Sequence, residues 1–244
     1  MSDLKVAFIT GGNRGIGFET AREIGRTGVT VVIGSRDLGK GTAAAALLTA
    51  EGIAAESISF DASEPDSISA AYDHFDKNYG KLDILVNNAG VMFEPIYGNS
   101  AGDISAQTLR KTFDTNFFGV VATTQALLPL IRKSSAGRIV NVSSQLGSLV
   151  LHATKDSPID AVKAFAYNSS KTALNSFTIH MANLLKDTTI KVNSAHPGWV
   201  KTELGGPDAQ IEVSDGSKTS VRLALLSDDG PTGGFFHMEE ALPW

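Results

Sequence analysis

The sequence contains no cysteine, and this absence excludes several kinds of site at once. A chain without thiols cannot form a disulfide bond, a thiolate metal site or a cysteine nucleophile. The sequence also lacks an apolar run long enough to cross a membrane and a dense block of lysine and arginine. With a formal net charge of −5 as well, we expect no metal, no nucleic acid and no membrane as a partner.

A secretory signal is not expected either, because strand-like residues begin already at Lys5. We therefore expect a cytoplasmic protein. Hydrophobic residues make up 42% of the 244 positions, which is ordinary for a globular chain that buries a sizeable core. Since no low-complexity linker or internal repeat divides the sequence, we expect one domain over residues 1–244.

Strand-like and helix-like segments alternate along the chain, and several of the strand-like segments are continuously apolar. The predicted strands are Lys5–Ile9, Val29–Ile33, Ala55–Phe60, Ile84–Val86, Arg138–Val142, Ile190–Ser194 and Gly234–His237. The predicted helices are Gly17–Arg26, Leu38–Ala50, Pro65–Tyr79, Leu109–Ile131, Ala161–Leu185 and Gly216–Leu226. This alternation predicts a doubly wound α/β fold, with a seven-stranded parallel sheet and helices on both faces.

A glycine-rich turn, Thr10–Gly17, joins the first predicted strand to the first predicted helix. Glycine allows positive φ angles and leaves room for a phosphate to approach the backbone, and the helix N-terminus offers N–H groups to that anion. The spacing G-x-x-x-G-x-G differs from the common G-x-G-x-x-G. An ordinary tight turn is the alternative, but the position favours a dinucleotide site on a Rossmann fold.

The end of the second predicted strand indicates which dinucleotide binds. A site for NAD has an acidic residue there, whereas this chain has Ser35 followed by Arg36. Together with Arg14 of the glycine turn, Arg36 could hold the 2′-phosphate of NADP(H), although both arginines could also be solvent-exposed, with Arg36 paired to Asp37. Asp61 and Ala62 follow the third strand, where they could contact the adenine, or Asp61 could cap a helix.

Tyr167 and Lys171 lie four residues apart and therefore share one face of a predicted helix. A lysine cation lowers the pKa of a neighbouring phenol, which suits Tyr167 to proton donation. Ser144 follows the fifth strand and could polarise a substrate carbonyl, or it could cap backbone groups. Asn116 interrupts a predicted helix, where a local irregularity could hold a water molecule linked to Lys171.

These motifs together resemble the short-chain dehydrogenase/reductase family, and within it the NADPH-dependent carbonyl reductases, over essentially the whole chain. The resemblance rests on the glycine turn, Asn87–Gly90, the P-G pair of Pro197 and Gly198, and the spacing from Ser144 to Gly147. It implies a catalytic set of Asn116, Ser144, Tyr167 and Lys171. The cofactor-binding positions that it implies, together with the strand ends, are Gly11, Asn13, Arg14, Gly15, Ile16, Gly17, Ser35, Arg36, Asp61, Ala62, Asn88, Ala89, Gly90, Tyr167, Lys171, Pro197, Gly198, Val200 and Thr202.

The substrate end of the site is less clearly marked in the sequence. Ser144 and Tyr167 stand 23 positions apart, about ten more than in most members of that family, so we expect an insert over residues 151–165 beside the active site. Residues 203–215 are expected to form a substrate loop. The substrate-binding residues expected are Ser144, Gln145, Leu146, Tyr167 and Trp199, with Phe93 and Leu149 also lining the site and His152 facing solvent.

The resemblance implies NADPH-dependent reduction of aldehydes or ketones to alcohols, with a small-molecule carbonyl or alcohol as partner. An NAD(P)-dependent alcohol or hydroxysteroid-type dehydrogenase working in the oxidative direction is the alternative. A non-catalytic NADP-sensing protein on the same fold is a third reading. A homo-oligomer and a monomer both remain open, because the insert lies near the helices through which most members of the family dimerise.

Overall fold

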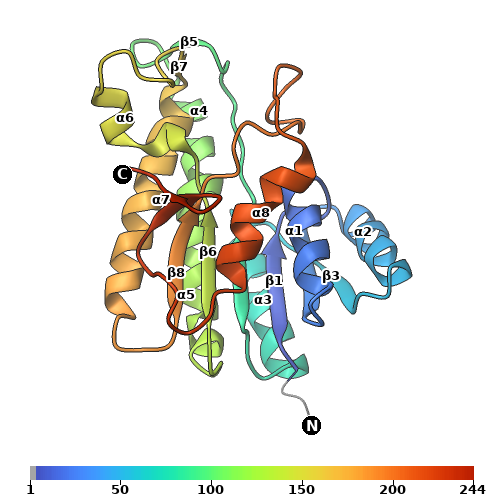
Figure 1. Ribbon diagram of the computed structural model, residues 1–244. Helices are drawn as coiled ribbons and strands as arrows, with labels where there is room; N and C mark the ends of the chain where they lie inside the picture. The colour runs from blue at the N-terminus through green and yellow to red at the C-terminus, as the bar shows by residue number, and fades with distance from the viewer. Residues whose placement is uncertain (1–3) are drawn as a thin grey trace.

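The computed structural model describes residues 4–244 and contains a central sheet between two layers of helices (Figure 1). The strands are β1 (Val6–Thr10), β2 (Thr30–Ser35), β3 (Ala55–Ser59), β4 (Ile84–Asn87), β5 (Gly98–Asn99), β6 (Arg138–Val142), β7 (Val162–Lys163), β8 (Lys191–Ala195), β9 (Phe235–His237) and β10 (Glu240–Ala241). The helices are α1 (Gly15–Gly25), α2 (Leu38–Ala50), α3 (Pro65–Asn78), α4 (Ala106–Phe113), α5 (Gly119–Ile131), α6 (Leu149–Ala153), α7 (Phe165–Leu184) and α8 (Val213–Ala224).

The central sheet has the strand order β10-β9-β8-β6-β4-β1-β2-β3, so the chain reverses its direction of winding between β1 and β4. All seven predicted strands are present, and they pair in parallel. The prediction of seven strands was one too few, because β10 adds an antiparallel edge strand through the pairs Glu240–His237 and Ala241–Phe236. A two-residue strand is too short to show the alternation of side chains on which the prediction depended.

Alternating side chains of the central strands fill two separate cores. In β1, Val6 and Phe8 face the core beneath α3, α5 and α7, whereas Ala7 and Ile9 face the core beneath α1, α2 and α8. The neighbouring strands follow the same alternation, since both faces of the sheet are covered. Figure 1 shows this layered arrangement, in which the carboxyl ends of the parallel strands meet along one edge. None of the helices in residues 4–244 is long and apolar enough to span a membrane.

Two predicted helices differ from the structure in ways that affect the site. The segment predicted as one helix over Leu109–Ile131 consists of α4, a π-helical turn at Asp114–Phe118 and α5. The helix predicted from Ala161 begins only at Phe165, because Val162–Lys163 pairs as β7 with β5 in a small second sheet. A long apolar periodicity does not reveal a π turn, and a two-residue pairing leaves no pattern in the sequence.

Candidate active site

The carboxyl ends of the parallel strands open into a cavity of about 860 Å³. Its lining includes the glycine turn after β1 and residues that follow β2, β3, β4, β6 and β8. This is the position at which open α/β sheets bind their ligands. The sequence thus located the cavity correctly, because each strand end carries the small or polar residues from which it was predicted.

The glycine turn is shaped for close contact with a ligand. Gly11 and Gly15 have φ angles of +64° and +55°, a region that favours glycine. A Cβ atom on Gly17 would lie 2.4 Å from Nδ2 of Asn88 and 2.6 Å from the carbonyl oxygen of Gly11. The Asn88 amide donates to the carbonyls of Thr10 (2.9 Å) and Gly11 (3.2 Å), so it fixes the turn from the end of β4. The backbone of the turn and the start of α1 are therefore left open to a pyrophosphate.

The two arginines proposed for the 2′-phosphate both line the cavity. Arg14, whose side chain is 66% exposed, forms an ion pair with Glu203 of the loop 203–215. Ser35 is buried, and its hydroxyl donates to the carbonyl of Asp37 (2.8 Å). Arg36 remains exposed at the cavity edge. The Glu203 carboxylate is therefore the anion that contacts Arg14 in this structure.

Other positions expected to contact the cofactor divide into two groups. Asp61 lines the cavity, and its Oδ1 accepts hydrogen bonds from the backbone and the hydroxyl of Ser63 (3.0 and 2.7 Å); these bonds form a turn before α3, whose N-cap is Glu64, so Asp61 does not cap the helix. The remaining expected positions that line the cavity are Gly11, Asn13, Gly15, Ile16, Gly17, Ala62, Asn88, Ala89, Gly90, Pro197, Gly198, Val200 and Thr202.

Tyr167 and Lys171 lie in the first two turns of α7, buried in the cavity wall. Burial raises the pKa of Tyr167 to about 12, and a hydrogen bond with the side chain of Ser144 acts in the opposite direction. Burial also lowers the pKa of Lys171 to about 8. The Lys171 ammonium lies 5.6 Å from the centre of the Tyr167 ring and donates to the carbonyl of Val142 (2.8 Å). At neutral pH the site therefore holds a neutral phenol beside an ammonium.

Ser144 and Asn116 complete the predicted set around this pair. Ser144 lies two residues after β6 in an extended conformation, and its Oγ also accepts a hydrogen bond from the backbone N–H of Leu146 (3.2 Å). Asn116 is fully buried in the π-helical turn, where its side chain bonds to both the N–H (2.8 Å) and the carbonyl (2.9 Å) of Val91. It also donates to Ser170 Oγ (3.1 Å), next to Lys171 in α7. The expected helix irregularity is thus present at Asn116.

Two residues that the sequence analysis did not select hold the start of α7. Glu94 accepts a hydrogen bond from the backbone N–H of Tyr167 (2.8 Å), and Ser100 accepts one from the N–H of Phe165 (3.1 Å). The Ser100 hydroxyl in turn donates to the Glu94 carboxylate. Glu94 and Tyr167 are 73 positions apart, and the only signal in the sequence is that Ala164, before the helix, has no side-chain oxygen to cap it.

The substrate side of the cavity is formed by the loop after β4, by segment 151–165 and by the region of Trp199. Its mostly apolar lining comprises Val91, Met92, Ile96, Tyr97, Leu146, Pro158, Ile159, Ala161, Val162 and Trp199, with Gln145 beside them. Phe93 and Leu149 were expected to line the cavity, but they lie outside its lining and are 54% and 63% exposed. Phe93 lies in a loop without regular structure and Leu149 begins the short helix α6, and in neither place does the sequence indicate which apolar side chain points inward.

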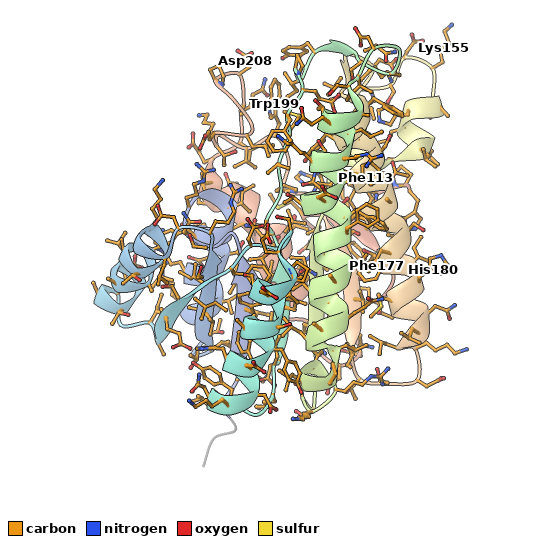
Figure 2. The ribbon with its side chains drawn as sticks, turned by 180° about the vertical axis from the view of Figure 1, so that it is seen from behind. Phe113, Lys155, Phe177, His180, Trp199 and Asp208 are labelled. Carbon is orange, nitrogen blue, oxygen red and sulfur yellow. The ribbon has the colours of Figure 1, made fainter. Side chains whose placement is uncertain are left out.

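His152 and Trp199 have contacts that differ from those expected. His152 is half-buried rather than solvent-facing, since its Nε2 lies 2.9 Å from the carbonyl oxygen of Leu146 and its Nδ1 3.2 Å from Lys163 Nζ. The Trp199 indole donates to the carbonyl of Gly205 (2.7 Å) and so anchors the loop 203–215. Figure 2 shows Trp199 and Asp208 at the same end of the molecule as Lys155.

The protein family whose model matches residues 5–211 is described as short chain dehydrogenase. Over the full chain, the sequence is 33% identical to human "Carbonyl reductase [NADPH] 1", of which 99% is covered. It is 31% identical to "Short-chain dehydrogenase/reductase 1" of Saponaria officinalis, again over the full chain and 97% of that relative. Among solved structures, NADPH-bound carbonyl reductase from chicken fatty liver is 25% identical and superposes with a TM-score of 0.85 over 99% of each chain.

Proposed function

The chain belongs to the short-chain dehydrogenase family, and we propose that it is an NADPH-dependent reductase that converts aldehydes or ketones to alcohols. The observation that carries this proposal is the burial of Ser144, Tyr167 and Lys171 together in one cavity with the glycine turn. A proton donor and a carbonyl-polarising hydroxyl are thus placed beside a cradle that suits a dinucleotide.

In the proposed reaction the Ser144 hydroxyl donates to the substrate carbonyl oxygen and polarises it. Tyr167 then transfers its phenolic proton to the same oxygen, and the Lys171 ammonium stabilises the phenolate that remains. A nicotinamide cofactor held at the glycine turn would supply the hydride for the carbonyl carbon. Asn116 fixes the position of these residues, because its side chain bonds the π-helical turn to Val91 and to the helix that carries Tyr167.

The preference for NADPH over NADH rests on the residues after β2. An acidic residue at this point would bind the ribose 2′-hydroxyl of NAD and repel a phosphate, and the chain has Ser35 and Arg36 instead. Arg14 and Arg36 are the two cations at this end of the cavity that we propose to hold the 2′-phosphate. For Arg14, binding requires that the phosphate replace the Glu203 carboxylate. Two relatives named for NADPH support the same preference.

The apolar lining of the substrate side supports a carbonyl compound with a largely apolar body. We propose that segment 151–165 acts as a substrate-side insert, since its residues Pro158 and Ile159 line the same cavity as the glycine turn. The loop 203–215 is proposed to close over the site. The hydrogen bond from Trp199 to Gly205 would hold the start of this loop in place.

Cofactor consumption measured with a panel of aliphatic and aromatic aldehydes and ketones tests this function. The expected result is oxidation of NADPH in equal amounts with alcohol formation, and a rate with NADH at least about tenfold lower. Replacing Arg36 by alanine should remove most of that preference. Faster consumption of NADH would overturn the phosphate assignment, and turnover only in the direction of alcohol oxidation would favour the alternative dehydrogenase. Cofactor binding without any turnover would favour the sensing protein.

A further inference from the structure

The helix that carries the proposed proton donor begins without a cap of its own. In an α-helix the first N–H groups lack partners within the helix and need acceptors from elsewhere. Ala164 precedes α7 and has no side-chain oxygen, while Tyr167 is the third residue of the helix. The turn most prone to fraying therefore contains the phenol on which the proposed reaction depends.

The missing acceptors come from the loop between β4 and α4. The Glu94 carboxylate lies 2.8 Å from the backbone nitrogen of Tyr167, and Ser100 Oγ lies 3.1 Å from that of Phe165. The two acceptors are joined, because the Ser100 hydroxyl donates to the second oxygen of Glu94. A carboxylate at this position also interacts favourably with the positive end of the helix dipole.

The small sheet of β5 and β7 holds this loop against the start of α7. Gly98 pairs with Val162 and Asn99 with Lys163, directly before Ser100 on one side and shortly before the helix on the other. Figure 1 shows β5 and β7 together at the end of the molecule where α7 begins. Glu94 is half-buried, and its two carboxylate oxygens accept hydrogen bonds from Tyr167 and from Ser100. These contacts fix the position of the carboxylate.

Glu94 does not line the cavity itself, but it stands in the chain between two residues that do. Met92 and Ile96, on either side of it, line the substrate side. The hydrogen bond from Tyr167 to Glu94 thus connects this loop segment with the backbone of the residue that would protonate the substrate. A change in this contact is expected to alter the position of the phenol relative to Ser144, while the glycine turn lies in a different part of the cavity.

We propose that Glu94 is a positioning residue for the reaction: its carboxylate caps α7 at Tyr167 and holds the phenol in place for proton transfer. This proposal rests on the proposed function, in which Tyr167 is the proton donor. Glu94 itself is not assigned any proton transfer. The hydrogen bond to the Tyr167 N–H, rather than the negative charge alone, is what the role requires.

Two substitutions at Glu94 and one matched control test this role. Glu94→Ala removes both acceptor oxygens, whereas Glu94→Gln keeps one oxygen to accept from the Tyr167 N–H. Ser105 caps α4 by accepting from the N–H of Thr108 (3.0 Å), so Ser105→Ala removes an N-cap at a helix that does not carry the phenol. For each protein, kcat and KM with the best carbonyl substrate, the Kd for NADPH and the thermal midpoint are measured.

We expect Glu94→Ala to lower kcat by about 10- to 100-fold, because small displacements of a catalytic group have effects of this size. The Kd for NADPH should stay within about twofold, and Glu94→Gln should recover kcat to within about fivefold of the natural protein. Ser105→Ala should lower the thermal midpoint about as much as Glu94→Ala does, but its kcat should stay within about twofold of that of the natural protein.

The proposal is overturned if Glu94→Ala keeps its kcat, if Glu94→Gln is as impaired as Glu94→Ala, or if Ser105→Ala loses kcat to the same extent. These outcomes are separate from failure of the proposed function, which would show as an absence of carbonyl reduction by the natural protein.

Discussion

Replacing Lys171 by methionine should make the cofactor-free protein more stable at neutral pH while it destroys turnover. The Lys171 side chain is 4% exposed, and burial lowers its pKa from 10.5 to about 8. This difference corresponds to about 3 kcal/mol by which the buried ammonium destabilises the folded chain at pH 7. Methionine keeps the apolar stem but loses the hydrogen bond to the Val142 carbonyl, which offsets about 1–2 kcal/mol. We expect a net gain of about 1–2 kcal/mol.

The pH dependence of this gain has a definite sign. Between pH 8 and 10.5 the unfolded chain keeps the proton on Lys171 while the folded chain has released it, so the stability of the natural protein rises with pH over this range. Lys171→Met lacks this rise, and its advantage at pH 7 should therefore disappear by about pH 10. Urea unfolding without cofactor, at pH 7 and at pH 9.5, measures both effects.

An exposed lysine provides the matched control. Lys155 lies on the surface (Figure 2), and Lys155→Met should change the unfolding free energy by less than about 0.5 kcal/mol at either pH. The prediction is refuted if Lys171→Met is less stable than the natural protein at pH 7, or if its advantage does not shrink as the pH rises. Either result would mean that the buried ammonium of Lys171 does not destabilise the folded chain.

Three further substitutions test other parts of the site. Tyr167→Phe should lower kcat by about 10²- to 10⁴-fold with the Kd for NADPH within about twofold, and retained turnover would exclude the phenol as the donor. Glu203→Gln should strengthen NADPH binding by up to about fivefold at low salt, because it frees Arg14 from an exposed ion pair; weaker binding in a fluorescence titration would contradict this. Gly17→Ala should weaken NADPH binding and lower the thermal midpoint, whereas Gly102→Ala, with open space around it, should do neither.

Much of the fold could be predicted because its strands are buried on both faces. Runs such as Val6–Ile9 and Ile84–Val86 are apolar throughout, and in parallel sheets such runs alternate with helices. In a parallel sheet the carboxyl ends of the strands lie at one edge, so the glycine turn and Ser144 could be predicted to lie at the same edge. The two-residue strands β5, β7 and β10 could not be predicted, since their pairing depends on what lies beside them in the folded chain.

The predictions for the site divide according to how far apart its partners lie in the sequence. Tyr167 and Lys171 are close in the chain and share a helix face, so spacing alone brought them together. The contacts of Tyr167 with Glu94 and of Arg14 with Glu203 span 73 and 189 positions. Neither follows from a local pattern, because each depends on how a loop crosses the end of the sheet.

Burial determines the protonation state in which the two titratable groups rest. Burial raises the pKa of Tyr167 to about 12 and lowers that of Lys171 to about 8, so the amine loses its proton well before the phenol does. Across the neutral range the cofactor-free site therefore holds a protonated phenol, which is the form that donates to a carbonyl oxygen. Oxidation of an alcohol requires the phenolate as base, and the loss of charge from Lys171 above pH 8 removes the cation that would stabilise it. From the chain's own residues we therefore infer that the cofactor-free site at neutral pH has the protonation state that carbonyl reduction requires.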